Sequence, residues 1–134
     1  MTIKDTQAML SAMDAILEPG EMVFCTATTA PLISAAIPLA LATFREAEGL
    51  SLILALQDAK DLNLPCDLPM QRITLSVFSS LEGIGLTAAV AEALAEAGIP
   101  CNMVAAFHHD HVFVPSSLAE TALAVLRRLQ ISAG

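Results

Sequence analysis

The chain contains no tryptophan and no tyrosine, and only 15% of its 134 residues are charged. Hydrophobic residues make up 55% of it, so the interior is predicted to be aliphatic. This composition excludes a disordered chain, and it leaves few charges to cover the surface of a lone monomer. We therefore expect a folded protein that hides apolar surface against a partner, most simply a second copy in a homodimer.

Among the charged residues, the positively charged ones are the fewer. Six Lys and Arg residues stand against fourteen Asp and Glu residues, for a net charge of −8. Nucleic acids and anionic membranes are bound through clustered Lys and Arg, so neither is expected as a partner. The apolar stretch of residues 30–44 contains Pro31 and Pro38 and is too short and too interrupted to span a bilayer.

Cysteine is rare, and the chain begins without the basic stretch and apolar core of a signal peptide. Cys25, Cys66 and Cys101 are an odd number and lack the paired spacing of a metal site. Reduced thiols in the cytoplasm are the expected state.

Familiar catalytic motifs are missing as well. There is no Ser-His-Asp pattern with a nucleophile elbow, no GxxxxGK phosphate loop and no HExxH motif. A nucleophile at Cys66 or Cys101 has no feature in its favour. We predict that the protein is not an enzyme and uses no cofactor or metal.

The first half of the chain is predicted to contain both helices and strands. Apolar residues recur at helical spacing, which predicts a helix that ends at Glu18-Pro19-Gly20; these residues are Met9, Leu10, Met13, Ile16 and Leu17. A strand at residues 22–28 is followed by a hairpin whose strands, 39–46 and 50–56, are joined around Gly49. A short helix at 57–62 leads to a linker at 63–69.

The second half reads as strand, helix, strand, strand, helix. The expected ranges are 73–79, 84–97, 101–107, a strand that ends at Val114, and 117–129. Two amphipathic helices with strands between them specify an α+β fold, and the ferredoxin-like arrangement is the natural solution. This arrangement needs one more strand, which we expect the first half of the chain to donate, from residues 22–28.

The strand-to-helix junction at residues 79–87 is the first candidate site. Backbone N–H groups at a helix start lack helical partners and attract a carboxylate. Gly83 and Gly85 would let a ligand approach, although two glycines are also consistent with a tight turn alone. A carboxylate at Glu82 would compete with an anion but would suit the ammonium group of a zwitterion.

The histidines at the predicted hairpin are the second candidate. If His109-Asp110 is a two-residue turn, His108 and His111 lie opposite each other on one sheet face and could bind zinc or nickel. The alternatives are a polar hairpin tip or a pH-sensitive group. No third ligand is evident, so we predict no metal site here.

Two segments, residues 79–90 (SSLEGIGLTAAV) and 97–104 (AGIPCNMV), resemble the ACT domain, the regulatory ligand-binding module of aspartate kinases. Residues 24–26 (FCT), 44–50 (FREAEGL) and 109–115 (HDHVFVP) are similar to small free-standing bacterial proteins with two tandem ACT-like halves. The resemblance implies a tandem ferredoxin-like (ACT-like) fold of βαββα units, with halves at residues 1–66 and 70–134.

The resemblance also implies that an amino acid or similar small metabolite binds where paired ACT units meet. The implied ligand-binding residues are Leu81, Glu82, Gly83, Ile84, Gly85, Leu86, Asn102, Met103 and Val104. Any regulated enzyme would be a separate chain. The alternative function is a ligand-free oligomerisation or protein-interaction module. Asn102 either contacts the ligand or caps a strand end. We also expect that Gly85→Val abolishes binding and leaves the fold largely intact.

Overall fold

In the computed structural model of the protein, residues 5–76 and 85–133 are described. The chain forms two compact units. Unit 2 is Gly20–Met70, and unit 1 combines Met1–Pro19 with Gln71–Gly134. The predicted division at residues 66–70 stays a prediction about domain boundaries. Each unit is an antiparallel sheet with helices, so the α+β fold is confirmed.

Unit 2 contains the hairpin predicted for the first half. Its elements are β2 (Met22–Ala27), α2 (Ala30–Ala36), the 3-10 helix η1 (Ile37–Leu39), β3 (Ala42–Glu46), β4 (Gly49–Ala55) and α3 (Leu56–Asp61). The sheet order is β3–β4–β2, and both pairs are antiparallel. Alternate residues of β2 and β4 enter a core with Ala36 and Ala59 from the helices; they are Val23, Ala27, Leu50, Leu52 and Leu54.

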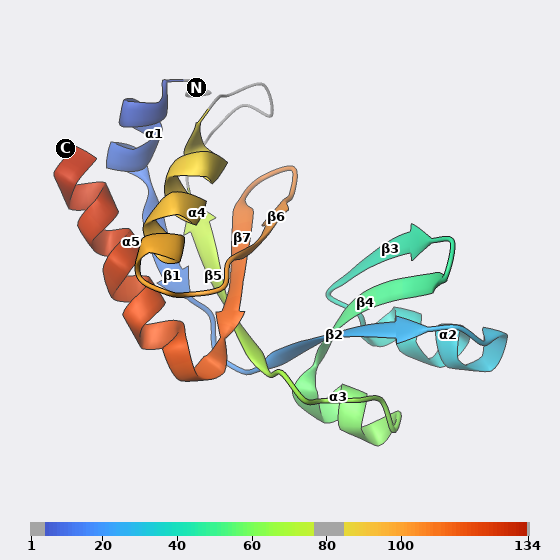
Figure 1. The fold of residues 1–134 in the computed structure, drawn as a ribbon. Coiled ribbons are helices and arrows are strands. Elements are labelled where there is room, and N and C mark those ends of the chain that lie inside the picture. The colour runs from blue at the N-terminus through green and yellow to red at the C-terminus, as the bar shows by residue number, and fades with distance from the viewer. Residues whose placement is uncertain (1–4, 77–84, 134) are drawn as a thin grey trace. The chain divides into compact units, whose positions relative to one another are not determined.

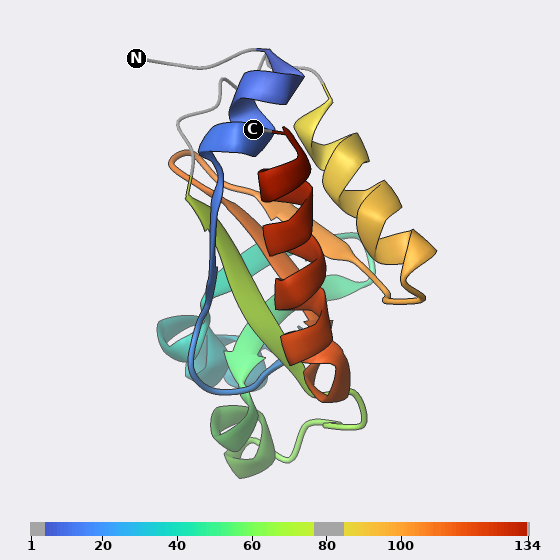
Figure 2. The same cartoon turned by 90° about the vertical axis from the view of Figure 1, so that its left-hand side faces the viewer.

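Unit 1 has a four-stranded sheet in the order β1–β5–β7–β6. The strands are β1 (Asp14–Leu17), β5 (Met70–Ser76), β6 (Asn102–Ala105) and β7 (Asp110–Pro115). Helices α1 (Thr6–Ala12), α4 (Leu86–Glu96) and α5 (Ala119–Ala133) lie along one side of this sheet (Figures 1 and 2). A 3-10 turn, Ser116–Leu118, leads into α5.

The core of unit 1 lies between the sheet and these helices. Leu86, Val90 and Leu94 are buried at intervals of four residues, as expected for the inner face of α4. They pack with Ile73 and Leu75 of β5 among other buried residues. Gly98, with φ of +75°, follows the C-terminal end of α4, where the sequence predicts the helix to end.

The strand that completes this sheet is β1, so the first half of the chain donates it as predicted, but the donated segment is residues 14–17 and not residues 22–28. The predicted helix also ends earlier, at Ala12, because Met13 is extended (φ −67°, ψ 132°). Asp14 pairs with Ser76 and Leu17 with Ile73. Met13 and Ala15 are buried and Leu17 packs against the core, a period of two that fits a half-buried strand.

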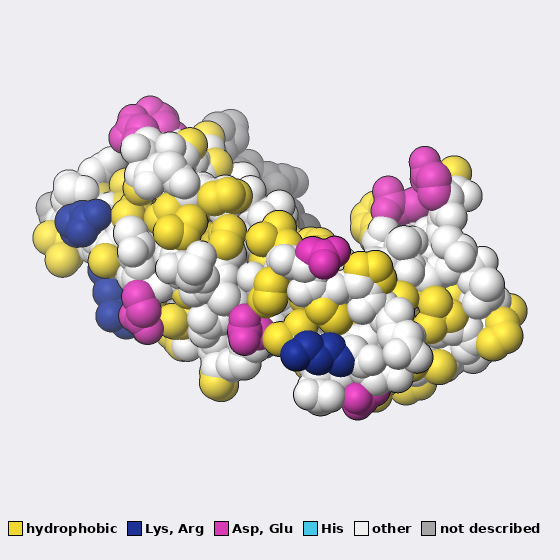
Figure 3. Space-filling model, turned by 60° about the horizontal axis from the view of Figure 1, so that its bottom comes forward, with side chains coloured by type: hydrophobic (Ala, Val, Ile, Leu, Met, Phe, Trp, Pro, Cys, Tyr) yellow, Lys and Arg dark blue, Asp and Glu magenta, His cyan; other side chains and the backbone are white. Residues whose placement is uncertain are grey.

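Among the described residues, no helix has the length and apolar character needed to cross a membrane. The face of the molecule drawn in Figure 3 shows apolar side chains interspersed with isolated charged ones. Several large apolar side chains are exposed, including Phe44 at 73%, Ile131 at 76% and Phe107 at 82%. The sparse charge of the sequence is therefore matched by exposed apolar groups in the structure.

Candidate ligand-binding site

Gly85 begins the helix at the predicted strand-to-helix junction. It is the N-cap residue of α4 and has φ of +101°, a left-handed conformation that favours glycine. The cap makes no side-chain hydrogen bond, and the first helical bond of α4 runs from the Ala89 N–H to the Gly85 carbonyl oxygen. The N–H groups of the first turn therefore lack helical partners and suit an anion.

Gly85 is also where α1 approaches α4. A Cβ atom at residue 85 would overlap the Thr6 hydroxyl and lie 3.1 Å from Thr6 Cγ2. The expectation that Gly85→Val leaves the fold largely intact stays a prediction, and the structure adds a cost in stability to it, because the larger side chain would collide with Thr6 of α1 and would strain the backbone. The missing Cβ serves the packing of unit 1.

The other predicted residues of the junction divide into two sets. Leu86 is only 4% exposed and its side chain enters the core, so only its backbone N–H can contact a ligand. Leu81, Glu82, Gly83 and Ile84 lie outside the described residues.

The predicted ligand residues of β6 face both sides of the sheet. Met103 packs against the helix-side core. Asn102 and Val104 face the opposite side, because side chains alternate along a strand. The Asn102 side-chain amide donates a hydrogen bond to the Phe113 carbonyl oxygen at 3.2 Å. This hydrogen bond links Asn102 to the neighbouring strand and fits a structural role, while the contact of Asn102 with a ligand stays a prediction.

Unit 1 does not bring Gly85 and Asn102 together. Asn102 pairs with Phe113 on β7, and β7 runs opposite to β5, so Asn102 lies toward the beginning of β5 (Figure 1). Gly85 comes after the end of β5, at the other end of the sheet. Between them, α4 has 11 residues and is about 16 Å long. One ligand could contact both only if Gly85 and Asn102 come from different copies of the chain.

A polar network that the sequence pattern does not predict lies on the helix-free side of this sheet. Thr74 Oγ1 donates to Glu18 Oε2 at 3.2 Å and lies 3.4 Å from His111 Nδ1. Arg72 forms an ion pair with the same Glu18 oxygen at 3.5 Å. The one sequence feature that points to this network is the alternation of polar Arg72 and Thr74 with buried Ile73 in β5. The apolar spacing instead predicts Glu18 at the end of a helix.

Burial and this network together affect the protonation of His111, and the network favours one tautomer of its neutral ring. A carboxylate accepts hydrogen bonds only, so the Thr74 hydroxyl proton points to Glu18 and the Thr74 oxygen accepts from His111 Nδ1. Burial lowers the pKa of His111, and Arg72 and His109 lower it further, while Asp110 and Glu18 raise it. His111 is therefore neutral near pH 7, with its proton on Nδ1 and a lone pair on Nε2.

The predicted pairing of His108 with His111 is wrong. The β6–β7 hairpin pairs Ala105 with Asp110 and Val104 with His111, and the Ala106 N–H donates to the His109 carbonyl oxygen. The turn is therefore formed by Phe107 and His108, so His108 lies at the tip. Within residues 5–76 and 85–133 there is no group of three potential metal ligands.

The cysteines of the described chain carry no sign of activation. All three are free thiols. Burial raises the pKa of Cys25, with a further increase from Cys66, and burial also raises the pKa of Cys101. A raised pKa favours the protonated thiol, which is a poor nucleophile.

Known proteins confirm the tandem ACT organisation that the sequence resemblance implies. One ACT domain model matches residues 2–71 and a second ACT domain model matches residues 71–128. No curated protein matches the chain.

Solved structures match over most of the chain. A Vibrio cholerae protein of unknown function, described as a possible transport protein, is 40% identical, with a TM-score of 0.83 over 92% of this chain and 94% of that one. The ligand-free regulatory subunit of Thermus thermophilus aspartate kinase is 11% identical, with a TM-score of 0.64 over 86% and 95% of the two chains. The second likeness shows the fold alone. With ACT domain models matched to both halves of its sequence, the chain belongs to the ACT domain family.

Proposed function

We propose that the protein is a regulatory protein that binds a small amino acid between paired ACT units. The observation that carries the proposal is the start of α4. Its first-turn N–H groups follow a left-handed Gly85 and have no side-chain cap at that residue. This arrangement suits the carboxylate of an amino acid.

The second half of the proposed site supports a paired arrangement. Asn102 and Val104 lie on β6, at the other end of the sheet from Gly85. Because all three residues belong to unit 1, a site that uses both ends needs unit 1 of two copies, as in a homodimer. The proposed contacts are the N–H groups of Ile84, Gly85 and Leu86 to the ligand carboxylate, with Glu82 toward its ammonium group.

The regulated activity is proposed to belong to a separate enzyme. The Thermus protein of similar fold is described as a regulatory subunit of aspartate kinase, which is a precedent for a free-standing regulatory chain. We propose a cytoplasmic location because the free thiols suit a reducing compartment.

A thermal-shift screen with the twenty amino acids tests the proposal. A ligand present at one hundred times its Kd should stabilise the folded protein by about 2.7 kcal/mol. Calorimetry would then measure the affinity of each amino acid that raises the Tm. If none raises the Tm or binds, the proposed function is wrong.

A second function, a ligand-free oligomerisation or interaction module, is favoured by the exposed apolar side chains such as Phe44 and Ile131. The same screen separates the two functions. An interaction module would form a stable oligomer whose mass and Tm do not respond to amino acids.

A further inference from the structure

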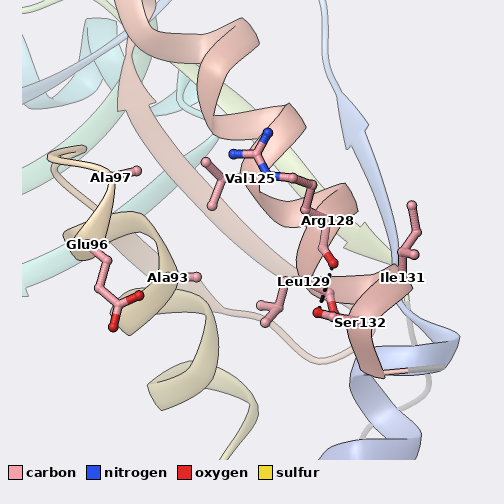
Figure 4. A pocket seen from close by; sticks show the side chains of 8 residues that line it. All are labelled: Ala93, Glu96, Ala97, Val125, Arg128, Leu129, Ile131 and Ser132. Carbon is pink, nitrogen blue, oxygen red and sulfur yellow. Dashed lines mark hydrogen bonds between the residues drawn. The ribbon is translucent and has the colours of Figure 1, made fainter.

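A groove runs between the C-terminal parts of α4 and α5 in unit 1 (Figure 4). It has a volume of about 600 Å³. Apolar side chains line it, with Ala93 from α4, Ala97 directly after the end of that helix, and Val125, Leu129 and Ile131 from α5. The Ile131 side chain is 76% exposed, so the groove leaves apolar surface in contact with water.

One charged side chain of each sign accompanies this apolar strip. Glu96 is the last residue of α4, and Arg128 lies across the groove on α5 (Figure 4). Both residues are exposed. Neither forms an ion pair within the part of the chain that the structure describes. The two charges are therefore available to a partner.

We propose that this groove is the contact surface of a twofold homodimer. A twofold axis that lies in the plane of contact, perpendicular to the line from Glu96 to Arg128 and midway between them, places each position of one copy opposite the other position of its partner. Each Glu96 then meets Arg128 of the other copy, which makes the surface self-complementary as a twofold interface requires. The guanidinium also approaches the negative C-terminal end of the partner helix α4.

The groove supplies the other part of a dimer interface, an apolar centre. Ile131 and Leu129 of each copy would cover those of the other, and the two charge pairs would lie at the rim. Rim charges contribute more to specificity and association rate than to raw affinity. The apolar centre should therefore determine the affinity, and the charges should determine which surfaces meet.

The test measures self-association without any amino acid, so it does not depend on the proposed ligand. Sedimentation equilibrium from 1 to 100 µM (about two decades around a Kd of about 10 µM) should give a dimer of the 14.0 kDa chain. In a twofold dimer, Glu96→Lys or Arg128→Glu creates two like-charge contacts. Each variant should raise the dimer Kd at least about tenfold.

Two combinations of these substitutions test whether Glu96 of each copy contacts Arg128 of the other. The double variant Glu96→Lys/Arg128→Glu restores both opposite-charge pairs and should return the Kd to within about threefold of the wild-type value. A mixture of the two single-variant proteins should form heterodimers, because both cross-contacts between those chains then have opposite charges. Arg127→Glu changes an exposed charge on the same helix outside the groove and is the matched control.

Circular dichroism of each variant should show an unchanged fold, since the substituted side chains are exposed. A strictly monomeric wild type would overturn the proposal. So would a dimer whose Kd is the same in Glu96→Lys, Arg128→Glu and Arg127→Glu, since that dimer must use another surface. A double variant as weak as the single variants would also overturn it.

Discussion

Thr6 lies so close to the backbone of Gly85 that residue 85 has no room for a side chain. Thr6 is the first residue of α1 and Gly85 precedes α4, so the contact joins the starts of two helices that are far apart in the sequence. The same glycine begins the helix end proposed to bind the ligand. Its conformation therefore serves both packing and the proposed site.

Substitution of this glycine should cost stability for two separable reasons. Gly98→Ala is the control for backbone strain, because residue 98 has φ of +75° and open space around it. It should lower the free energy of unfolding by about 1 kcal/mol. Gly85→Ala should cost about 1–3 kcal/mol more, because it adds a collision with Thr6. Urea unfolding measures both values.

The double variant Gly85→Ala/Thr6→Ala removes the atoms of Thr6 that the new Cβ would meet most closely. It should lose no more stability than Gly98→Ala, apart from the effect of Thr6→Ala measured alone. A double variant as unstable as Gly85→Ala would contradict the steric explanation.

The N-terminal strand should be essential to unit 1. Ala15 is 2% exposed and faces the helix-side core, whereas its neighbour Ile16 is 43% exposed on the other face of β1. Ala15→Asp would bury a charge, with an expected loss of about 3 kcal/mol or more, and Ile16→Asp should cost about 1 kcal/mol. Equal losses in urea unfolding would show that β1 does not pack as described.

His111 should make stability depend on pH. Its pKa in the folded state lies below its ordinary value of 6.5, so the unfolded chain binds more protons as the pH falls through 6.5. The free energy of unfolding should therefore decrease between pH 7 and the lower pKa of the folded state. Burial raises the pKa of Asp110, which has the opposite effect at more acidic pH.

Urea unfolding from pH 7.5 to 5.5 measures this dependence (about one pH unit on each side of the ordinary histidine pKa). His111→Gln should flatten it, and His108→Gln, at the exposed hairpin tip, is the control. Nitrogen chemical shifts of His111 near pH 7 should show a protonated Nδ1. A protonated Nε2 with a bare Nδ1 would be incompatible with the Glu18–Thr74–His111 network.

Charge at the start of α4 should affect ligand binding and stability in opposite directions. Thr87 is exposed in the first turn of α4. Thr87→Glu should stabilise the helix by about 0.3–1 kcal/mol, and Thr87→Lys should destabilise it by a similar amount. A ligand carboxylate at the same place would be repelled by the introduced glutamate and attracted by the introduced lysine.

Calorimetry with an amino acid that the screen identifies should therefore show weaker binding to Thr87→Glu and equal or tighter binding to Thr87→Lys. Two results would place the ligand away from the start of α4. One is tighter binding to the more stable variant, Thr87→Glu, than to Thr87→Lys, and the other is equal affinity of both variants.

The sequence by itself determined those helices and strands whose apolar spacing fits only one type of secondary structure. The stripe of α4, the hairpin around Gly49 and the ACT resemblance all depend on local spacing, and the structure contains the helix and the hairpin as expected. It could not determine residues 13–17, because Met13, Ile16 and Leu17 fit a helix while Met13, Ala15 and Leu17 fit a strand.

Only the tertiary structure decided that ambiguity. The open edge of β5 offers unpaired backbone groups to residues 14–17, and this pairing outweighs the helical pattern. The same long-range packing brings Glu18, Thr74 and His111 into one network and places Thr6 against Gly85. These contacts join residues far apart in the chain, and local spacing carries no information about which distant segments will meet.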